Sequence, residues 1–477
     1  MNIASIIRDA TQQYQDKTAV IHGNRQITYR ELFAAADAVA EVLKACGVMQ
    51  AQRVAFLCAD SIEYISVSLA VLSLQAVIVP VPPSLAPDEI DAVLEQMNAN
   101  YFIFDRESHA REGARQLSLD GACERTFYLL YRRARNGLPP DYFRLNPAFI
   151  RFSSGTTGAS KGVLLSHEAI FKRTQAADTL LRITPGDVII WVLSMSFHFV
   201  VTILLFLQRG AAIVLCGAPF PEALYEGLRA HKGTFLYASP FHYQSLISSP
   251  ECTGDDMSNI RLAISTAMHL QPGVANDFHR KFRFELSQAY GIIEVGLPFI
   301  NCSGDPLKRA SVGMVLPDYE INIVNPDAEG IGEAYIKGPG MFDAYFTPWQ
   351  RREEITVDGW FATGDVGKLD ADGFLFLAGR EKNVINFAGM KIFPYEVESV
   401  LNQHPAVQES CVYGFPHPQY GELPCAKIVP RDTSSTDIDS RDLRTFCYQR
   451  LAAYKVPKEF HLVQHLEKTA SGKVRRW

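Results

Sequence analysis

The stretch Arg151-Phe-Ser-Ser-Gly-Thr-Thr-Gly-Ala-Ser-Lys-Gly-Val163 decides how the rest of this sequence is interpreted. The apolar run 148–152 before it and the run 163–165 after it predict two buried strands, so a loop is expected between them. Five hydroxyl side chains, three glycines that can adopt positive φ and one lysine lie close together there. Hydroxyls, concave backbone amides and a lysine suit a phosphate group, which makes this a candidate phosphate-binding loop.

The residues that would bind phosphate in this loop are Ser153, Ser154, Gly155, Thr156, Thr157, Gly158 and Lys161. The loop is not a Walker motif, because that motif requires Gly-Lys-Ser/Thr and here the lysine lies between Ser160 and Gly162. The alternative is a surface turn of small polar residues, which needs no ligand.

Length and composition predict a globular protein of more than one domain. The chain has 477 residues, too many for a single hydrophobic core, and 47% of them are hydrophobic and 21% charged. The net charge of −6 gives no electrostatic reason to expect nucleic acid as a partner. The nine cysteines lack metal-binding spacing, which suits free thiols in a reducing compartment, so a cytoplasmic location is expected.

No segment of the sequence is predicted to cross a membrane. The N-terminal residues lack an apolar core of the length found in signal peptides. The longest apolar run, 197–207, is shorter than a membrane-spanning helix, so a buried helix is expected there.

The order of the expected elements indicates an α/β fold. Strands and helices alternate through 53–104 and again from 168 onward, as in a doubly wound α/β layer, whereas 106–147 is expected to be irregular. Short alternating strands from Val312 predict a small β-barrel or a curled sheet. After Arg380 comes a compact α+β module, so we expect one domain at 1–380 and another at 381–477.

Three further stretches carry residues suited to a nucleotide. In Gln288-Ala-Tyr290-Gly291-Ile-Ile-Glu294, a tyrosine can stack on a purine and a carboxylate four residues later can bind Mg²⁺, although a common turn also explains the pattern. In Trp360-Phe-Ala-Thr363-Gly364-Asp365, the aspartate can accept both hydroxyls of a ribose. The stretch Lys468-Thr-Ala-Ser471-Gly472-Lys473 offers a lysine near the C-terminus, where lysines are usually disordered.

Together, in this order and at these separations, the motifs make the chain resemble the adenylate-forming superfamily. That superfamily comprises acyl- and aryl-CoA synthetases, adenylation domains of peptide synthetases, and luciferases. The resemblance runs nearly end to end, from Thr28-Tyr-Arg-Glu31 to Lys473. It implies a large N-terminal domain of two α/β layers and a small β-barrel, joined by a hinge to a small mobile C-terminal domain, with the active site between them.

The resemblance also implies residue roles. Ser153 to Lys161 would hold the β- and γ-phosphates of ATP, Tyr290 would stack on adenine, Glu294 would hold Mg²⁺, Asp365 would take the ribose hydroxyls with help from Arg380, Lys382 would be the hinge residue, and Lys473 would contact the attacking carboxylate and the α-phosphate. The catalytic set would be Lys161, Glu294 and Lys473.

The chemistry implied is a two-step ligation. A carboxylate attacks the α-phosphorus of ATP, pyrophosphate leaves, and the acyl-AMP then reacts with a thiol. ATP and Mg²⁺ are the expected cofactors, and the thiol would belong to CoA or to a separate carrier protein. Cations and aligned donors are needed because one anion must attack another.

The sequence departs from the superfamily pattern in three places. Ile293 stands where a threonine is usual, Ser265-Thr266-Ala267-Met268 replaces Gly-Gly-Ala-Pro, and Glu467 replaces a frequent proline. A lost hydrogen bond to a charged group is worth roughly 1.5–3 kcal/mol, so we expect slower adenylation or a compensating hydroxyl.

The acid pocket is predicted from the pair Phe197-His198. Adenylation domains for α-amino acids carry Phe-Asp here, so histidine favours an aryl or acyl acid without an α-amine, although a core histidine is an alternative. The expected pocket residues are His198, Phe199, Phe241, Tyr243, Ala289, Gly291, Gly296 and Leu297. Amino-acid adenylation and a non-catalytic nucleotide-binding relative remain alternatives, and the sequence names neither the acid nor the thiol.

Overall fold

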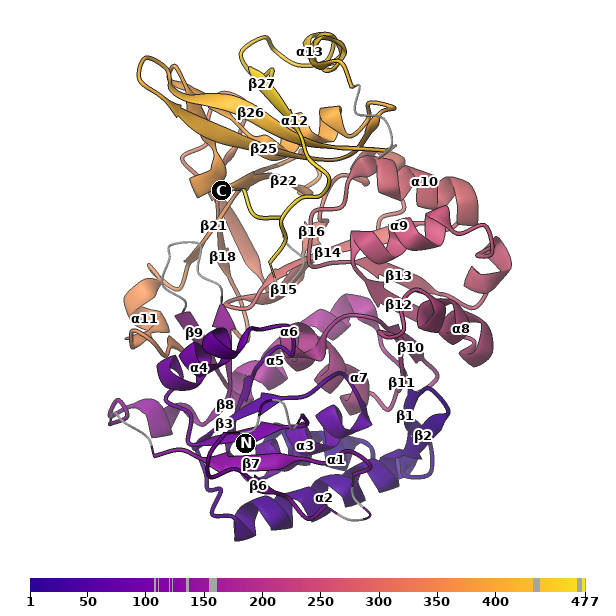
Figure 1. Ribbon diagram of the computed structural model, residues 1–477, viewed down its shortest axis with the longest axis vertical. Helices are drawn as coiled ribbons and strands as arrows, with labels where there is room; N and C mark the ends of the chain where they lie inside the picture. The colour runs from indigo at the N-terminus through magenta and orange to yellow at the C-terminus, as the bar shows by residue number, and fades with distance from the viewer. Residues whose placement is uncertain are drawn as a thin grey trace.

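The computed structural model describes residues 1–106, 109, 111–119, 121, 123–133, 137–153, 161–431, 438–469 and 474–476. Within these residues the chain forms two nine-stranded sheets, a four-stranded sheet and a five-stranded sheet. The C-terminal domain, coloured orange to yellow, lies at the top of Figure 1, over the four-stranded sheet and one edge of the second nine-stranded sheet. No helix in the described ranges is both long and apolar enough to cross a membrane.

The first nine-stranded sheet carries the candidate phosphate loop. Its strands β8, β4, β3 and β5 are parallel and buried, as expected for strands with helices on both faces. The strands are, in sheet order, β20 (Gln350–Arg351), β19 (Ala344–Tyr345), β9 (Lys161–Ser166), β8 (Pro147–Ser153), β4 (Val77–Pro80), β3 (Arg53–Leu57), β5 (Tyr101–Phe104), β7 (Tyr128–Tyr131) and β6 (Arg115–Gln116).

The second nine-stranded sheet carries the candidate purine stretch. It is parallel from β14 to β1 and ends in an antiparallel hairpin at each edge. The strands are, in sheet order, β16 (Met314–Val315), β15 (Gly296–Asn301), β14 (Leu286–Ile292), β13 (Leu262–Ser265), β12 (Phe235–Ala238), β10 (Val188–Trp191), β11 (Ala212–Leu215), β1 (Thr18–His22) and β2 (Arg25–Thr28).

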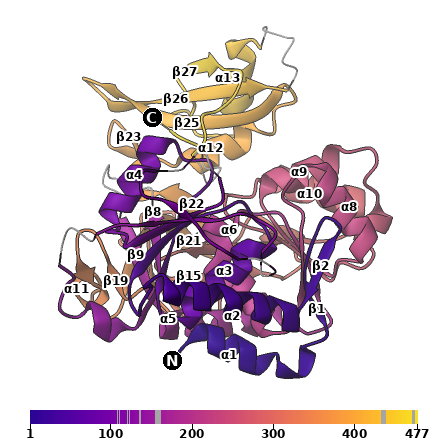
Figure 2. The same cartoon turned by 60° about the horizontal axis from the view of Figure 1, so that its bottom comes forward.

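Helices cover the sheets in layers. One large core joins the facing sides of both nine-stranded sheets, and a second core lies under the outer helices of the second sheet, which stand at the right of Figure 2. The helices between or beside the sheets are α1 (Ile3–Ala10), α2 (Tyr29–Ala45), α3 (Ile62–Ser73), α4 (Pro87–Gln96) and α5 (His167–Leu181). The outer helices are α8 (Glu222–His231), α9 (Pro240–Ser248) and α10 (Pro272–Phe282).

The structure differs from two of the expectations drawn from the sequence. The interval 106–147, expected to be irregular, contains β7, whose apolar residues pair antiparallel with β5, so that prediction was wrong for 128–131. The apolar run that starts at Phe197 is helical and buried as expected, but it has three parts: α6 (Met195–His198), a π-helical turn (Phe199–Ile203) and α7 (Leu204–Gln208). Short π-helical segments are frequent at functional sites.

The small β unit is a four-stranded antiparallel sheet of β17 (Glu320–Val324), β18 (Gly332–Lys337), β21 (Phe361–Leu369) and β22 (Leu375–Arg380). The short helix α11 (Arg352–Ile355) precedes β21. The C-terminal domain consists of β23 (Ile385–Phe387), β24 (Met390–Ile392), α12 (Pro394–Leu401), β25 (Val407–His417), β26 (Gly421–Pro430), α13 (Ser440–Tyr448) and β27 (Glu459–Leu462).

The C-terminal domain contacts the rest of the chain through Phe393 and Tyr395. Phe393 packs with Ile331 and Val366 in a small apolar cluster. The ring of Tyr395 stacks on His269, with centroids 4.8 Å apart and an interplanar angle of 8°. On the same ring, the guanidinium of Arg476 lies 5.1 Å from the centroid.

The end of the chain is held by a buried ion pair. Arg476 forms a two-point ion pair with Glu398 of α12 and also donates to the carbonyl of Val412 at 2.6 Å. Both side chains of the pair are less than a tenth exposed. Removing one partner of such a pair leaves an uncompensated buried charge, so Arg476 is held against α12 of its own domain.

Candidate active site

Three segments distant in sequence meet at Asp365. The hydroxyl of Tyr290, on β14, donates to one carboxylate oxygen at 2.5 Å, and Nε of Arg380, on β22, lies 2.7 Å from the other. Asp365 and Arg380 are direct neighbours across β21 and β22. The sequence predictions for these three residues therefore converge on one place, where the second nine-stranded sheet adjoins the four-stranded sheet (Figure 1).

The local chain explains why this carboxylate is so well placed. The amide of Asp365 donates to the hydroxyl of Thr363 at 3.0 Å, and that hydroxyl donates to the carbonyl of Ala334 at 2.7 Å. Gly364, between them, has φ +68°, a value that favours glycine. Arg380 also donates to the carbonyl of Thr363 at 2.9 Å, so the Thr-Gly-Asp stretch of β21 is bonded from three sides.

The electrostatics keep this cluster in one protonation state at neutral pH. Burial, together with the neighbouring Asp365 carboxylate, raises the pKa of Tyr290 well above its usual value, so the phenol stays neutral and keeps donating. A carboxylate accepts hydrogen bonds from hydroxyl groups, which is the chemistry that the sequence prediction of ribose binding requires.

Glu294 and Lys161 are brought together by Tyr345, which the sequence predictions missed. Glu294 lies in the turn between β14 and β15, and the hydroxyl of Tyr345 donates to its Oε1 at 3.3 Å. The Nζ of Lys161 lies 4.4 Å from the centroid of the Tyr345 ring. The signal available in the sequence was the aromatic run 342–346, whose β19 residues pair with β9 directly after the phosphate loop.

Arg173 of α5 holds the turn that carries Glu294. Its guanidinium is fully buried and donates three hydrogen bonds, two to the carbonyl of Gly340 and one, at 3.0 Å, to the carbonyl of Ile293. The carbonyl of Glu294 in turn accepts the amide of Phe342 at 2.7 Å. Ile293 thus contributes its backbone to the support of the turn, while its side chain packs against the main core.

Six residues of the predicted site are not among those that the structure describes. Ser154, Gly155, Thr156, Thr157, Gly158 and Lys473 lie outside the described residues. Ser153 and Lys161 are paired across β8 and β9, so the loop leaves and re-enters the sheet at adjacent positions. Lys382 lies in an exposed 3-10 turn (Glu381–Asn383) that directly follows β22.

The donor set fits a metal ion bound mainly by a nucleotide. Within the described ranges, no three His, Cys, Asp or Glu side chains gather as a metal site. Mg²⁺ at nucleotide sites is usually held by one or two carboxylates together with phosphate oxygens and water. The single partly buried carboxylate of Glu294, across Tyr345 from Lys161, meets that requirement.

The residues predicted for the acid pocket fall into two groups. His198 is the last residue of α6, and its ring lies beside Trp191, with ring centroids 6.4 Å apart. Four other predicted pocket residues are buried in the same inner layer: Phe199, Ala289, Gly296 and Leu297. Phe241 is 51% exposed, packs with Phe220 and His242, and belongs to the outer helix α9. Gly291 is exposed at the end of β14.

The prediction for Tyr243 was wrong. Its ring is fully buried in the outer core, edge to face with Phe278, and its hydroxyl donates to the carbonyls of Leu236 and Ile264. It faces away from His198 because α9 covers the outer side of the sheet, whereas α6 covers the inner side.

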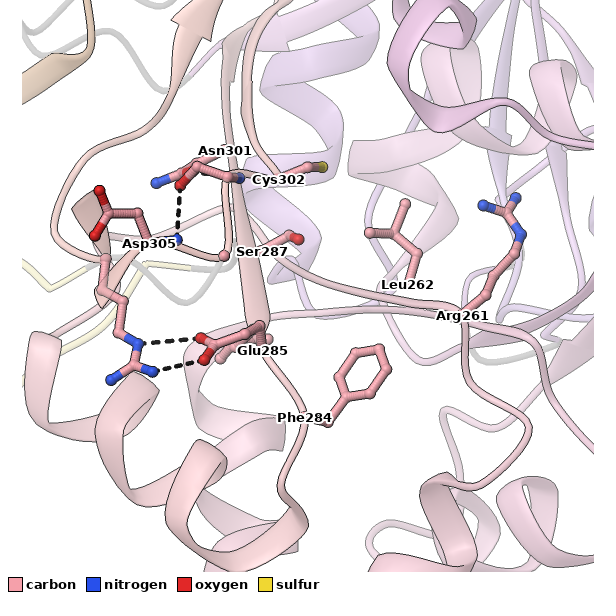
Figure 3. Close-up of a pocket in the computed structure, with 12 residues that line it drawn as sticks. Arg261, Leu262, Phe284, Glu285, Ser287, Asn301, Cys302 and Asp305 are labelled. Carbon is pink, nitrogen blue, oxygen red and sulfur yellow. Dashed lines mark hydrogen bonds and ion pairs between the residues drawn. The ribbon is translucent and has the colours of Figure 1, made fainter. Parts of the chain in front are cut away.

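A separate surface pocket lies at the other end of the second nine-stranded sheet (Figure 3). It has a volume of about 310 Å³, and Leu262 and Leu286, at the beginnings of β13 and β14, line it. Three of its charged groups are in ion pairs, Glu285 with Arg309 at 2.6 Å and Arg261 with Asp187 at 2.7 Å. The candidate residues lie instead near the carboxyl ends of these strands, which is the usual binding edge of parallel sheets.

Comparison with known proteins agrees with this geometry. The family model "AMP-binding enzyme" matches residues 7–346, and the model "AMP-binding enzyme C-terminal domain" matches residues 396–473. The chain belongs to the AMP-binding enzyme family. Tyr290 and Glu294 lie within the first match, whereas Asp365 and Arg380 lie in the interval between the two matches.

Relatives of similar length share this architecture. A protein of Oryza sativa subsp. japonica named 4-coumarate--CoA ligase-like 9 is 28% identical over 100% of this chain and 92% of its own. A feruloyl-CoA synthase of Amycolatopsis sp. is 29% identical over 96% and 94%. ATP-bound MatB from Rhodopseudomonas palustris superposes with a TM-score of 0.85 at 26% identity over 99% and 97%, and apo MatB with 0.76 at 27% identity over 100% and 98%.

The start of α6 generates a pH-dependent prediction. The amide of Met195 donates to Asp60 at 2.9 Å, and burial raises the pKa of Asp60 from 3.8 to about 7. A carboxyl group whose pKa is raised by folding stabilises the fold at low pH and loses that contribution as pH rises through the folded value. The parent protein should therefore lose this contribution as pH rises, whereas Asp60→Asn has no such group to lose. The free energy of unfolding of Asp60→Asn minus that of the parent protein should increase by about 1.4 kcal/mol per pH unit between pH 5 and 7.

Chemical denaturation at pH 5, 6, 7 and 8 measures this difference. Asp60→Asn keeps an acceptor for the Met195 amide, whereas the control Asp60→Ala removes it and should be less stable than Asp60→Asn at every pH. A constant difference between Asp60→Asn and the parent protein from pH 5 to 8 would contradict the assignment of a raised pKa.

Proposed function

We propose that this protein is an AMP-forming ligase that activates a carboxylic acid with ATP and transfers the acyl group to a thiol. The observation that carries the proposal is the meeting of Tyr290, Asp365 and Arg380 at one buried carboxylate, in a chain that belongs to the AMP-binding enzyme family. The named relatives are ligases that form acyl- or aryl-CoA.

In this proposal Asp365 accepts the ribose hydroxyls, Tyr290 stacks on the adenine, and Arg380 keeps the carboxylate ionised. Lys161 and the loop that it ends bind the β- and γ-phosphates. When bound, Mg²⁺ would neutralise phosphate charge, and Glu294 is the carboxylate that would hold it. Its hydrogen bond from Tyr345 and the support of the turn by Arg173 keep that carboxylate oriented.

The two steps are assigned to two arrangements of the chain. The proposed boundary between 380 and 381 falls between the two family matches, which end at 346 and begin at 396. The higher TM-score to ATP-bound than to apo MatB supports the view that the arrangement described here serves acyl-AMP formation. Lys473 then contacts the carboxylate and the α-phosphate, and rotation about Lys382 prepares the thioester step.

The proposed substrate is an aryl or acyl acid without an α-amine, and the acceptor is CoA or the phosphopantetheine of a separate carrier protein. His198 supports the choice of acid, because a buried ammonium group needs a carboxylate partner and α6 provides none in its sequence, Met-Ser-Phe-His. Amino-acid adenylation is the alternative, and a carboxylate reaching the pocket from another segment would favour it.

ATP–pyrophosphate exchange across a panel of acids tests the proposed function. We expect exchange with aromatic or medium-length aliphatic acids, and rates lower by at least about tenfold with free α-amino acids, because each 1.4 kcal/mol of ammonium desolvation costs a factor of about ten. His198→Asp should lower exchange with the simple acids. An α-amino acid that exchanges as fast as the best simple acid would move the protein to the amino-acid class, and exchange with none of them would refute the ligase assignment.

Separating the two half-reactions tests the assignment of Lys473 and Lys382. Lys473→Ala should abolish pyrophosphate exchange yet still form thioester from synthetic acyl-AMP and CoA. Lys382→Pro should show the reverse pattern, since proline fixes φ and hinders rotation at the hinge. Lys391→Ala, an exposed lysine on β24, serves as a control for general effects of losing a lysine. Loss of both half-reactions in Lys473→Ala would refute a role restricted to the first step.

A further inference from the structure

Arg151 is a cation beside the candidate site to which no role has been given. It lies on β8, two residues before Ser153, and is only partly exposed. One guanidinium nitrogen donates to the carbonyl of Phe197 at 2.7 Å, and the guanidinium carbon lies 5.3 Å from the centroid of the Phe197 ring. Its Nε is buried and has no hydrogen-bond acceptor in the part of the chain that the structure describes.

The comparison with Arg173 shows what is unusual about Arg151. A guanidinium has five N–H donors, and Arg173 directs its donors to two backbone carbonyls through three hydrogen bonds. Among the described residues, Arg151 has one carbonyl acceptor. Within that part of the chain Arg173 is thus satisfied by the fold, whereas most donors of Arg151 remain available to a further group.

The charge of Arg151 is also incompletely matched. Among the residues that the structure describes, no carboxylate forms an ion pair with it, and the following residues 154–160 include no acid. Burial lowers its pKa to about 10, while the charge of Glu294 acts in the opposite direction, so the guanidinium stays charged at neutral pH. If Glu294 holds Mg²⁺, its charge is shared with the metal, and Arg151 needs another anion.

The position of Arg151 indicates which anion of the proposed reaction it binds. In the proposed function, Lys161 and the loop after β8 bind the β- and γ-phosphates, which leaves Lys473 as the one cation assigned to the carboxylate of the acid. The carbonyl that Arg151 contacts belongs to the residue immediately before His198, which is the proposed neighbour of the acid. Arg151 therefore lies between the entry of the phosphate loop and the acid side of the site.

We propose that Arg151 binds the carboxylate of the acid substrate. In this role it is a specificity-determining residue, because it makes the site prefer the negatively charged carboxylate to a neutral group. This inference rests on the proposed function. A guanidinium N–H donates a charge-assisted hydrogen bond to a carboxylate oxygen, which is stronger than a bond to a neutral oxygen and therefore favours the ionised group. With one carboxylate oxygen held, the other is directed toward the α-phosphorus.

The proposed contact also suits the course of the reaction. The free carboxylate oxygen forms a bond to the α-phosphorus, and the bond from that phosphorus to pyrophosphate breaks, with its electron pair leaving on pyrophosphate. The carboxylate thereby loses its negative charge and becomes a neutral acyl group. Arg151 binds the acid more tightly than the acyl-AMP, so its hold weakens when the first step is complete.

Binding measurements test the proposal without any turnover. The probes are cinnamate and octanoate, together with their neutral amides cinnamamide and octanamide, titrated calorimetrically into the protein in the presence of Mg²⁺ and an ATP analogue with a methylene bridge between the α- and β-phosphates. The parent protein should bind at least one carboxylate about tenfold or more tightly than its amide. Arg151→Met should lose this preference, and Arg151→Lys should keep part of it.

The other outcomes separate the alternatives. If Arg151→Met binds carboxylate and amide with the same ratio as the parent protein, the proposal is overturned and the arginine serves the Phe197 carbonyl alone. Weaker binding of the ATP analogue with an unchanged carboxylate preference would assign Arg151 to phosphate and also overturn it. Octanedioate is titrated beside octanoate. If Arg151→Met weakens the binding of octanedioate alone, the arginine binds a carboxylate at the far end of the acid, and the assignment to the reacting group is overturned.

The proposed function itself is checked in the same experiment. A parent protein that binds the ATP analogue but none of the four probes, and that shows no exchange with any acid, would refute the ligase function and this inference with it. A different result would refute the role of Arg151 alone. In that case the parent protein prefers carboxylates, and Arg151→Met, shown to be folded by its thermal melting curve, retains the same preference.

Discussion

The arrangement of the candidate site depends on one buried carboxylate. Asp365 is 6% exposed, and a buried charge is costly unless hydrogen bonds and an opposite charge compensate it. Tyr290 and Arg380 supply that compensation from β14 and β22, and in doing so they tie the edge of the second nine-stranded sheet to the four-stranded sheet. Arg380 is also the last residue of β22, so the chain enters the C-terminal domain directly from this cluster.

Two series of contacts extend from the cluster. On one side, Lys161 lies on the ring of Tyr345, which bonds to Glu294 in the turn after β14, so the phosphate loop and the carboxylate proposed for Mg²⁺ belong to one unit. On the other side, Tyr395 of α12 lies between His269 and Arg476, which joins the C-terminal tail to the loop after β13. A site built at such a junction is completed only when both domains are in place, and this suits a reaction in which one carbonyl needs two different surroundings.

The sequence predicted the residues whose chemistry is local and missed those defined by distant partners. Thr363, Gly364 and Asp365 are consecutive in β21, and the aspartate next to the other two in sequence suggested ribose binding, which stays a prediction. Arg173 and Arg151 could not be found in the same way, because their partners are backbone carbonyls, of Ile293 and of Phe197, which sequence motifs do not record. Tyr243 was misplaced because the apolar character of α9 does not reveal which side of the sheet the helix covers, and β7 was missed because its four residues lie within a polar connection.

The most direct test of this account is whether Asp365 binds the hydroxyl groups of the ribose. Calorimetric binding of ATP and of 2′,3′-dideoxy-ATP should be compared in the parent protein and in Asp365→Asn, which keeps the shape of the side chain and a donor–acceptor pair near Tyr290. The account predicts that the parent protein binds ATP more tightly by about tenfold or more, and that Asp365→Asn binds the two nucleotides with nearly equal affinity. Equal affinities in the parent protein, or the same preference for ATP in Asp365→Asn, would contradict it.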